Sequence, residues 1–546
     1  MGISTPNEFL IAMTPESIQV QDLIAVDTYI KVENESQKKR VWAKVMSIER
    51  LNPLFPRESA QEIAYEQIEA IDTIASISRE MITAKCQILG IDKGDGTFDI
   101  LGYPIKPTSP VYRPKIKDVQ RIILGQLKED RAIKIGRLKT RDEINVSLDG
   151  HFIVSRHLAI LAMTGAGKTV SCRKIIEELI DKNYPILIFD PHEDYVNLTE
   201  YSDNVEIYVP DINLQQEDEI QIVKYIKDLS GEDISDAQER VYFNYLSLLK
   251  NENKRNELMI LFNSTIGTSE ILKLKTIWDI RNLNDLIIDY RNSATSKKEW
   301  SDDLKPKLAA LNGSIANSLS NLGTFFRIKA QTRKAAQTIE NMKKISKISA
   351  KGANKLPPPA EMGELIQKGK VSIILFSGYS VSIRQSFASA ILHQLLNLRI
   401  ENKIPRFLIV LEEAQNFVPS KTEGIEVKSS VGIVKQIATE GRKFGIGLVL
   451  ISQRPSRVDP TVLSQCNSYL IMRIVNPADQ SYIRSTIETI GKEEIDLLPS
   501  LTTGEAIVSG QCVNFPILVK IEKAKTEGVY EETDAFDELK KWNPSP

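Results

Sequence analysis

The sequence is poor in the residues that form disulfides and transition-metal sites. Among 546 residues there are four cysteines and four histidines. No two cysteines have a CxxC spacing, and the histidines show no paired spacing that is typical of metal ligands. We therefore expect reduced, packed thiols and no zinc or redox centre. These residues are Cys86, Cys172, Cys466 and Cys512, and His151, His157, His192 and His393.

Long apolar runs and a strong net charge are missing as well. No apolar stretch approaches the ~18 residues that a membrane span needs. Met1 to Ala25 also lacks a basic start followed by an apolar block. We therefore expect a cytoplasmic protein that does not enter a membrane. The formal net charge is −2, with 42% hydrophobic and 26% charged residues, which is ordinary for a globular chain of two or three domains.

The octapeptide Ala162 to Thr169 carries the strongest functional signal. It follows an apolar run and precedes a helical pattern, as a phosphate-binding loop does. Backbone N–H groups of such a loop surround a triphosphate, Lys168 reaches the β- and γ-phosphates, and Thr169 supplies a hydroxyl to Mg²⁺. Ala162 stands where a first glycine is usual, which is tolerable if its φ is negative. The alternative is a small-residue turn without a ligand. The predicted ATP-binding residues are Thr164, Gly165, Ala166, Gly167, Lys168, Thr169 and Val170.

Two adjacent carboxylates, Glu412 and Glu413, follow the apolar run Arg406 to Leu411, which is typical of a buried strand. The C-terminal ends of such strands point to the crevice in which a triphosphate lies. We expect Glu412 to hold the Mg²⁺ shell through water, and Glu413 to orient or deprotonate the attacking water. The alternative is solvated surface.

A third segment suggests a site that is shared between subunits. Arg442 stands beside Gly441, where it can be presented to a neighbour's γ-phosphate. Gln453 ends the apolar run Leu448 to Ser452 and is placed to sense the γ-phosphate or position water. The alternative for Arg442 is a solvated loop cation, and the alternative for Gln453 is a strand-end polar residue.

From Ile135 onward, apolar strands alternate with helical patterns, which indicates an α/β fold with a mainly parallel, helix-covered sheet. Asp190 follows the second strand and is a weaker candidate for the Mg²⁺ water shell, with a capping role as the alternative. The predicted strands are Leu158–Ala162, Pro185–Phe189, Ser372–Phe376, Phe407–Leu411, Leu448–Ser452 and Tyr469–Ile474.

The order of these motifs resembles the HerA-type ATPases, relatives of the FtsK translocases, from about Ile135 to Lys520. The motifs that carry the resemblance are Arg156–Leu161, Thr164–Thr169, Asp190–His192, Leu411–Pro419, Glu440–Gly445, Ser452–Arg457, Leu463–Cys466 and Asn476–Gln480. Gln415, where the family commonly has His, and Ala162 depart from the pattern.

This resemblance implies a RecA-like P-loop core in a homo-hexamer that moves double-stranded DNA by ATP hydrolysis. It places the Walker roles on Lys168, Thr169, Glu412 and Glu413, and the arginine finger on Arg442. Arg156 falls on a basic residue that serves the nucleotide site. The implied partner is a NurA-like nuclease or a phage-defence effector that docks on an N-terminal barrel. The alternative function is an ATP-stabilised ring scaffold that regulates an effector with little DNA transport of its own.

The domain organisation follows from the same patterns. Short β-branched runs with turns predict a small β-barrel over residues 1–134. A turn is expected at Lys93–Gly96 and a helical insertion at Gln61–Ile77. The predicted strands of the barrel are Glu8–Met13, Leu23–Val32, Val41–Ile48 and Met81–Ile91. The ATPase core is predicted over 135–218 and 356–525, a helical insertion over 219–355, and a tail over 526–546.

A basic stretch inside the helical insertion is the feature that favours a nucleic-acid partner. Residues 327–355 contain nine basic residues against one acid, Glu340. In several copies around a ring they could line a channel for a duplex, and a solvated helix face is the alternative. The basic residues are Arg327, Lys329, Arg333, Lys334, Lys343, Lys344, Lys347, Lys351 and Lys355.

Overall fold

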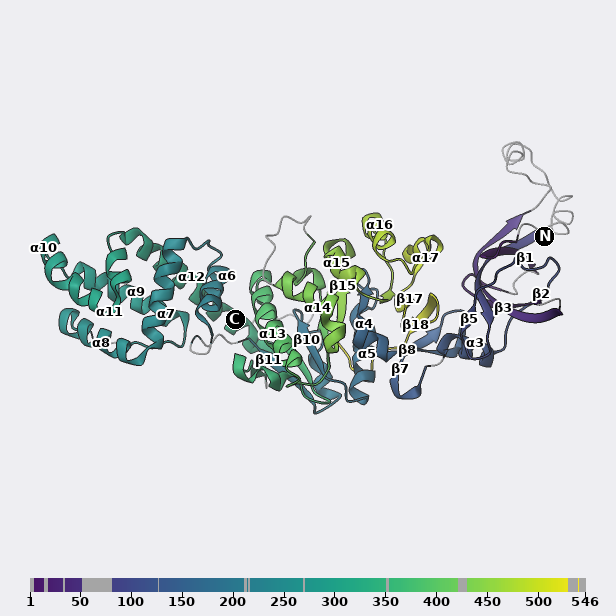
Figure 1. The fold of residues 1–546 in the computed structure, drawn as a ribbon, viewed down its shortest axis with the longest axis horizontal. Coiled ribbons are helices and arrows are strands. Elements are labelled where there is room, and N and C mark those ends of the chain that lie inside the picture. The colour runs from purple at the N-terminus through teal and green to yellow at the C-terminus, as the bar shows by residue number, and fades with distance from the viewer. Residues whose placement is uncertain are drawn as a thin grey trace, which may run out of the picture. The chain divides into compact units, whose positions relative to one another are not determined.

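The computed structural model describes residues 4–13, 18–32, 35–51, 81–125, 127–210, 214, 217–268, 271–349, 353–420, 430–528 and 539. The chain divides into two compact units. The first unit comprises Met1–Lys182, Ile451–Ser456 and Leu463–Lys525, and the second comprises Asn183–Leu450, Arg457–Val462 and Thr526–Pro546. Figure 1 shows the elements of each unit by label and colour. The helix expected over Gln61 to Ile77 lies outside the described residues.

The first unit begins with an antiparallel sheet of the order β1-β4-β3-β2-β6, with β5 paired to β4. Its strands are β1 (Glu8–Met13), β2 (Leu23–Val32), β3 (Glu35–Leu51), β4 (Met81–Asp92), β5 (Phe98–Asp99) and β6 (Val111–Tyr112). Register shifts at Trp42/Ala43 and Val45/Ser47 interrupt the ladder between β3 and β4, which lets the long strand bend. Within the described residues no ladder joins β1 to β6, so the described strands form a half-barrel, in agreement with the expected barrel-type domain.

The remainder of the first unit forms another sheet, of the order β9-β16-β17-β18-β7-β8. Strands β9 (Leu158–Leu161) and β16 (Ser468–Ile471) are parallel. Strand β17 (Glu505–Gly510) pairs antiparallel with β18 (Ile517–Ile521). The hairpin of β7 (Ala132–Leu138) and β8 (Arg141–Asp149) extends this sheet. Its helices are α3 (Ile116–Leu124), η2 (Glu129–Arg131), α4 (Gly150–Arg156), α5 (Lys168–Asp181), α16 (Pro477–Thr486), α17 (Lys492–Leu497) and η9 (Leu498–Ser500).

The second unit contains a sheet of parallel strands in the order β12-β11-β13-β10-β14-β15. These strands are β10 (Ile186–Asp190), β11 (Val205–Val209), β12 (Asn354–Lys355), β13 (Val371–Leu375), β14 (Phe407–Leu411) and β15 (Ile446–Ser452). Strands β10, β13 and β14 are buried along their whole length, as their continuous apolar runs predict. The expectation of a mainly parallel sheet is therefore confirmed. The helices beside it are η3 (Val196–Glu200), η5 (Pro359–Leu365), α13 (Val381–Ile400), η6 (Ala414–Asn416) and α14 (Ser430–Phe444).

Helices fill the stretch between β11 and β12, and Figure 1 shows them gathered into a bundle. Aromatic side chains form much of the bundle's core, and buried polar groups among them are paired. Tyr245 donates to Asn284 Oδ1 at 2.9 Å, and Asn284 donates to the carbonyl of Phe325 at 3.2 Å. Such pairing removes the cost of burying these groups. The helices are α6 (Glu219–Ser230), α7 (Asp236–Lys250), α8 (Glu252–Ile266), α9 (Ile277–Asn292), α10 (Lys297–Glu299), η4 (Trp300–Leu304), α11 (Lys305–Ser318) and α12 (Leu322–Ser349).

The segment that links the two units also contains short helices. These are η8 (Pro455–Arg457) and α15 (Pro460–Ser464). Strand β15 has Ile446 to Leu450 in the second unit and its last two residues in the first.

Candidate active site

The phosphate-binding loop lies in the first unit between β9 and α5. Gly165 has φ +77° and Gly167 has φ +103°, a backbone region that L side chains rarely adopt. A Cβ at Gly167 would also lie 3.1 Å from Met472 Cε. Lys168 begins helix α5 and is 7% exposed. The strand, loop and helix therefore have the geometry that places backbone N–H groups around an anion at a helix N-terminus.

Ala162 fits the loop as expected, because it is not among the described non-glycine residues with positive φ. It is fully buried, and its N–H donates to the carbonyl of Ser452 at 3.2 Å. The next residue after Ser452 is Gln453, whose side chain approaches the loop. Thr164 Oγ1 lies 2.5 Å from Gln453 Oε1, with the threonine hydroxyl donating. The structure therefore brings Gln453 next to the predicted phosphate-binding residues.

The two predicted arginines occupy different surroundings. Arg156 ends helix α4, donates to the side chain of Gln511 and lies 5.2 Å from the ring centroid of Phe152. Arg442 lies in the last turn of α14, where a helix rather than an irregular turn presents it, and its side chain is exposed. Gly441 lets this helix pack closely, since a Cβ there would lie 3.0 Å from the carbonyl oxygen of Ile446. An exposed cation of this kind is available to another molecule.

The two predicted carboxylates lie in the second unit, directly after β14. Glu412 is fully buried and Glu413 is 4% exposed. Glu413 has φ +52°, which is uncommon for a residue with a Cβ and is a form of local strain that occurs at functional sites. Gln415 donates to Glu413 Oε2 at 2.5 Å, so the glutamine that departs from the family pattern contacts the predicted catalytic carboxylate.

Tyr195 is a site residue that the sequence did not reveal. Its hydroxyl donates to Glu412 Oε2 at 2.5 Å, and its side chain is fully buried. The two residues are 217 positions apart, so no local pattern pairs them. Asp190, at the end of β10, accepts a hydrogen bond from the Tyr195 N–H at 3.0 Å. The structure therefore places Asp190, Tyr195 and Glu412 in one buried group.

The carboxylate of Asp190 binds the turn that follows β10. Its Oδ1 accepts the N–H groups of His192 at 3.0 Å and Asp194 at 3.2 Å, and its Oδ2 accepts that of Tyr195. Burial raises the pKa of Asp190 to about 7, although the N–H groups of Tyr195 and His192 act in the opposite direction. These bonds hold the turn together and do not cap a helix, because the N-cap of the following helix, η3, is Tyr195.

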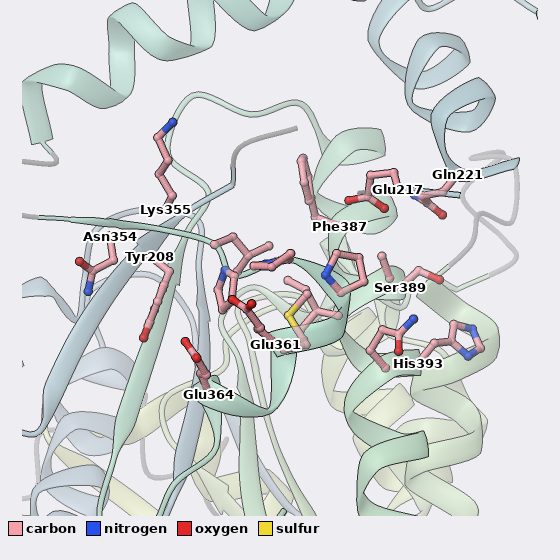
Figure 2. A pocket seen from close by; sticks show the side chains of 18 of the residues that line it. Tyr208, Glu217, Gln221, Asn354, Lys355, Glu361, Glu364, Phe387, Ser389 and His393 are labelled. Carbon is pink, nitrogen blue, oxygen red and sulfur yellow. The ribbon is translucent and has the colours of Figure 1, made fainter. Parts of the chain in front are cut away.

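A separate cavity of about 1100 Å³ lies in the second unit, where the helical insertion leaves and rejoins the sheet. Figure 2 shows Glu217, Glu361 and Glu364 around it, with Phe387 and Tyr208. Burial and the nearby Asp218 raise the pKa of Glu217 to about 7. None of the predicted site residues lines this cavity. For this reason we do not assign the nucleotide to it.

The remaining expectations concern the cysteines, metal-binding clusters and membrane-spanning helices. All four cysteines are buried and free, as expected, and burial raises the pKa of the Cys86 thiol to about 12. Over the part of the chain that is described, no cluster of three or more His, Cys, Asp or Glu residues could hold a metal ion. The same residues include no helix that is both long and apolar enough to cross a membrane.

A strand, a glycine-containing loop and a helix that starts at a buried lysine define a P-loop ATPase. Comparison with known proteins gives the particular family. The family profile described as "Helicase HerA, central domain" matches residues 133–395. The "DNA double-strand break repair helicase HerA" of Pyrococcus furiosus is 30% identical over 471 residues, which cover 82% of this chain and 78% of that protein. The chain belongs to the HerA helicase family.

Further relatives agree with this membership. The "Probable helicase MJECL08" of Methanocaldococcus jannaschii is 28% identical over 550 residues, covering 96% of this chain and 95% of that protein. Among solved structures, VirB4 of Thermoanaerobacter pseudethanolicus is 16% identical with a TM-score of 0.44, and the match covers 73% of this chain and 98% of that one. This structural similarity is too distant to add to the assignment.

Proposed function

We propose that this protein is a motor that moves double-stranded DNA and draws its energy from ATP hydrolysis. The geometry of the phosphate-binding loop carries the proposal, because Gly165, Gly167 and Lys168 have the conformations and burial that triphosphate binding requires. The printed name of the Pyrococcus furiosus relative, a DNA double-strand break repair helicase, supports DNA as the substrate.

In the proposed site, Lys168 and the loop N–H groups hold the β- and γ-phosphates of ATP. Thr169 and, through water, Glu412 hold Mg²⁺, while Glu413 orients the attacking water. The loop and these carboxylates belong to different units, and their meeting at one nucleotide is part of the proposal. The position of Gln453 beside Thr164 supports a role near the γ-phosphate.

The site is proposed to be shared between subunits of a homo-hexamer. Arg442 would reach the γ-phosphate on a neighbouring subunit and stabilise charge in the transition state. Its exposure at the end of α14 supports this, since a side chain turned into its own subunit could not serve another. Arg156 is proposed to assist the nucleotide site, with Gln511 as its partner in the isolated chain.

The proposed DNA surface includes the basic side of α12. Two of the predicted cations pair with acids, Lys329 with Asp285 at 3.0 Å and Lys334 with Glu232 at 2.8 Å. Arg333 is exposed. Exposed arginines can follow phosphates without reading bases. A NurA-like nuclease or a defence effector is the proposed partner, docking on the N-terminal sheet.

Displacement of a triplex-forming strand from a linear duplex tests translocation directly. We expect displacement that requires ATP and Mg²⁺, and none with the Glu413→Gln variant. If ATP-dependent assembly occurs without displacement, even with a bound effector, the motor is contradicted and the scaffold function replaces it.

A further inference from the structure

The end of strand β14 is tied to the turn after β10 by side chains that lie wholly inside the second unit. Both strands run parallel and pair along Phe189 and Leu411, so their C-terminal ends stand next to each other. Tyr195 extends from the turn and donates its hydroxyl proton to Glu412 Oε2 at 2.5 Å. Both side chains are fully buried, so water does not compete for this bond.

The turn itself is held in place. Asp190 accepts three backbone N–H groups from it, including that of Tyr195. Glu193 within the turn has φ +68°, a conformation that persists only where surrounding bonds determine it. The position of the tyrosine ring is therefore set from both sides, by the backbone bonds to Asp190 and by the hydroxyl bond to Glu412.

A carboxylate that accepts one hydrogen bond in a fixed direction loses its freedom to rotate. If Glu412 binds a water of the Mg²⁺ shell, the bond at Oε2 contributes to the direction in which the carboxylate faces that water. Groups that orient metal-binding side chains in this way commonly change metal affinity or activity by ~10- to 100-fold when they are removed.

We propose that Tyr195 is a positioning residue for ATP hydrolysis, acting through Glu412 on the Mg²⁺ shell. This inference rests on the proposed function of Glu412. Tyr195 itself touches neither nucleotide nor metal in this account. Asp190 contributes to the same positioning, because it fixes the turn from which Tyr195 reaches the carboxylate of Glu412.

The test is Tyr195→Phe in the full chain, which removes one oxygen and keeps the buried ring. We expect kcat to fall by ~10- to 100-fold, and the Mg²⁺ concentration at half-maximal rate to rise by about 10-fold. Binding of a fluorescent ATP analogue in EDTA should stay within about twofold, because the tyrosine acts on the metal and not on the phosphate loop. A purely structural role would leave the Mg²⁺ dependence unchanged.

Tyr208→Phe is the matched control. Tyr208 also lies in the second unit, is 5% exposed and donates to a carboxylate, Glu206 Oε2, at 2.7 Å. It lines the separate cavity and has no part in the proposed site. Its loss should leave kcat and the Mg²⁺ dependence unchanged.

A double-mutant cycle with Glu412→Gln separates an effect through Glu412 from a general one. In the Glu412→Gln background, adding Tyr195→Phe should lower kcat by less than about twofold. Glu412→Gln alone should raise the Mg²⁺ requirement, which keeps the inference testable even if Tyr195→Phe folds poorly. Wild-type kcat and Mg²⁺ dependence in Tyr195→Phe, or fully additive losses, would overturn it.

Different results would contradict the proposed function and the positioning role of Tyr195. If Lys168→Ala and Glu413→Gln hydrolyse ATP like the wild type, the proposed function is wrong. If both are inactive while Tyr195→Phe behaves like Tyr208→Phe, only the positioning role of Tyr195 is wrong.

Discussion

The left-handed backbone conformation of Glu413 predicts that substitution by glycine raises the stability of the protein and abolishes its activity. The φ of +52° at Glu413 costs about 1–2 kcal/mol for a residue with a Cβ. Its 4%-exposed carboxylate also costs desolvation free energy, which the bond from Gln415 offsets in part. Glu413→Gly removes both costs and adds about 0.5–1 kcal/mol of chain entropy in the unfolded state. We therefore expect the free energy of unfolding to rise by about 1 kcal/mol, or the Tm by ~1–2 °C, while ATP hydrolysis is lost.

Thermal unfolding and a steady-state hydrolysis assay on the same samples measure both effects. Thr108→Gly isolates the backbone contribution, because Thr108 has φ +68° in an exposed loop of the first unit. It should stabilise the protein and leave turnover unchanged. A Glu413→Gly variant that is less stable than the wild type, or that hydrolyses ATP at the normal rate, would contradict this prediction.

Three further predictions concern other parts of the molecule. Lys44 is 1% exposed and pairs with Glu494 at 2.5 Å. Lys44→Met should therefore lower the free energy of unfolding by about 3–5 kcal/mol in denaturant, and adding Glu494→Leu should recover most of this loss. Equal losses in the single and the double variant would contradict a stabilising pair. Burial raises the pKa of Asp190 from 3.8 to about 7, so its protonated form favours the folded state. The free energy of unfolding should therefore fall as pH rises from about 4 to 7, and Asp190→Asn should flatten that part of the pH dependence. An unchanged slope in the variant argues against the raised pKa. Arg442→Ala should keep nucleotide binding and assembly but lower turnover by ~10³-fold, whereas normal turnover would exclude a shared site.

The parts of the fold that the sequence predicted are those with strong local patterns. Strands β9, β10, β13 and β14 follow continuous apolar runs, and the phosphate-binding loop depends on neighbouring residues alone. β1 and β2 agree with their expected bounds. In β1 buried and exposed residues alternate, and such a pattern is visible within a few residues. Gly165, Gly167 and Lys168 were identifiable for the same reason.

The remaining features depend on contacts between distant segments. Tyr195 could not be paired with Glu412, because sequence carries no sign of a bond across 217 positions. The left-handed backbone of Glu413 was equally hidden, since glutamate has no preference for it. The pairing of β7 with β18 was hidden as well, because strand pairing is set by long-range packing and not by strand propensity.

The most direct test of the account is ATP hydrolysis by the purified protein with and without linear double-stranded DNA, with Glu413→Gln as the blank. We expect the duplex to stimulate hydrolysis strongly in the wild type and not at all in the variant. Turnover that is low and indifferent to duplex DNA, with the N-terminal sheet free or occupied by its partner, would contradict a DNA motor.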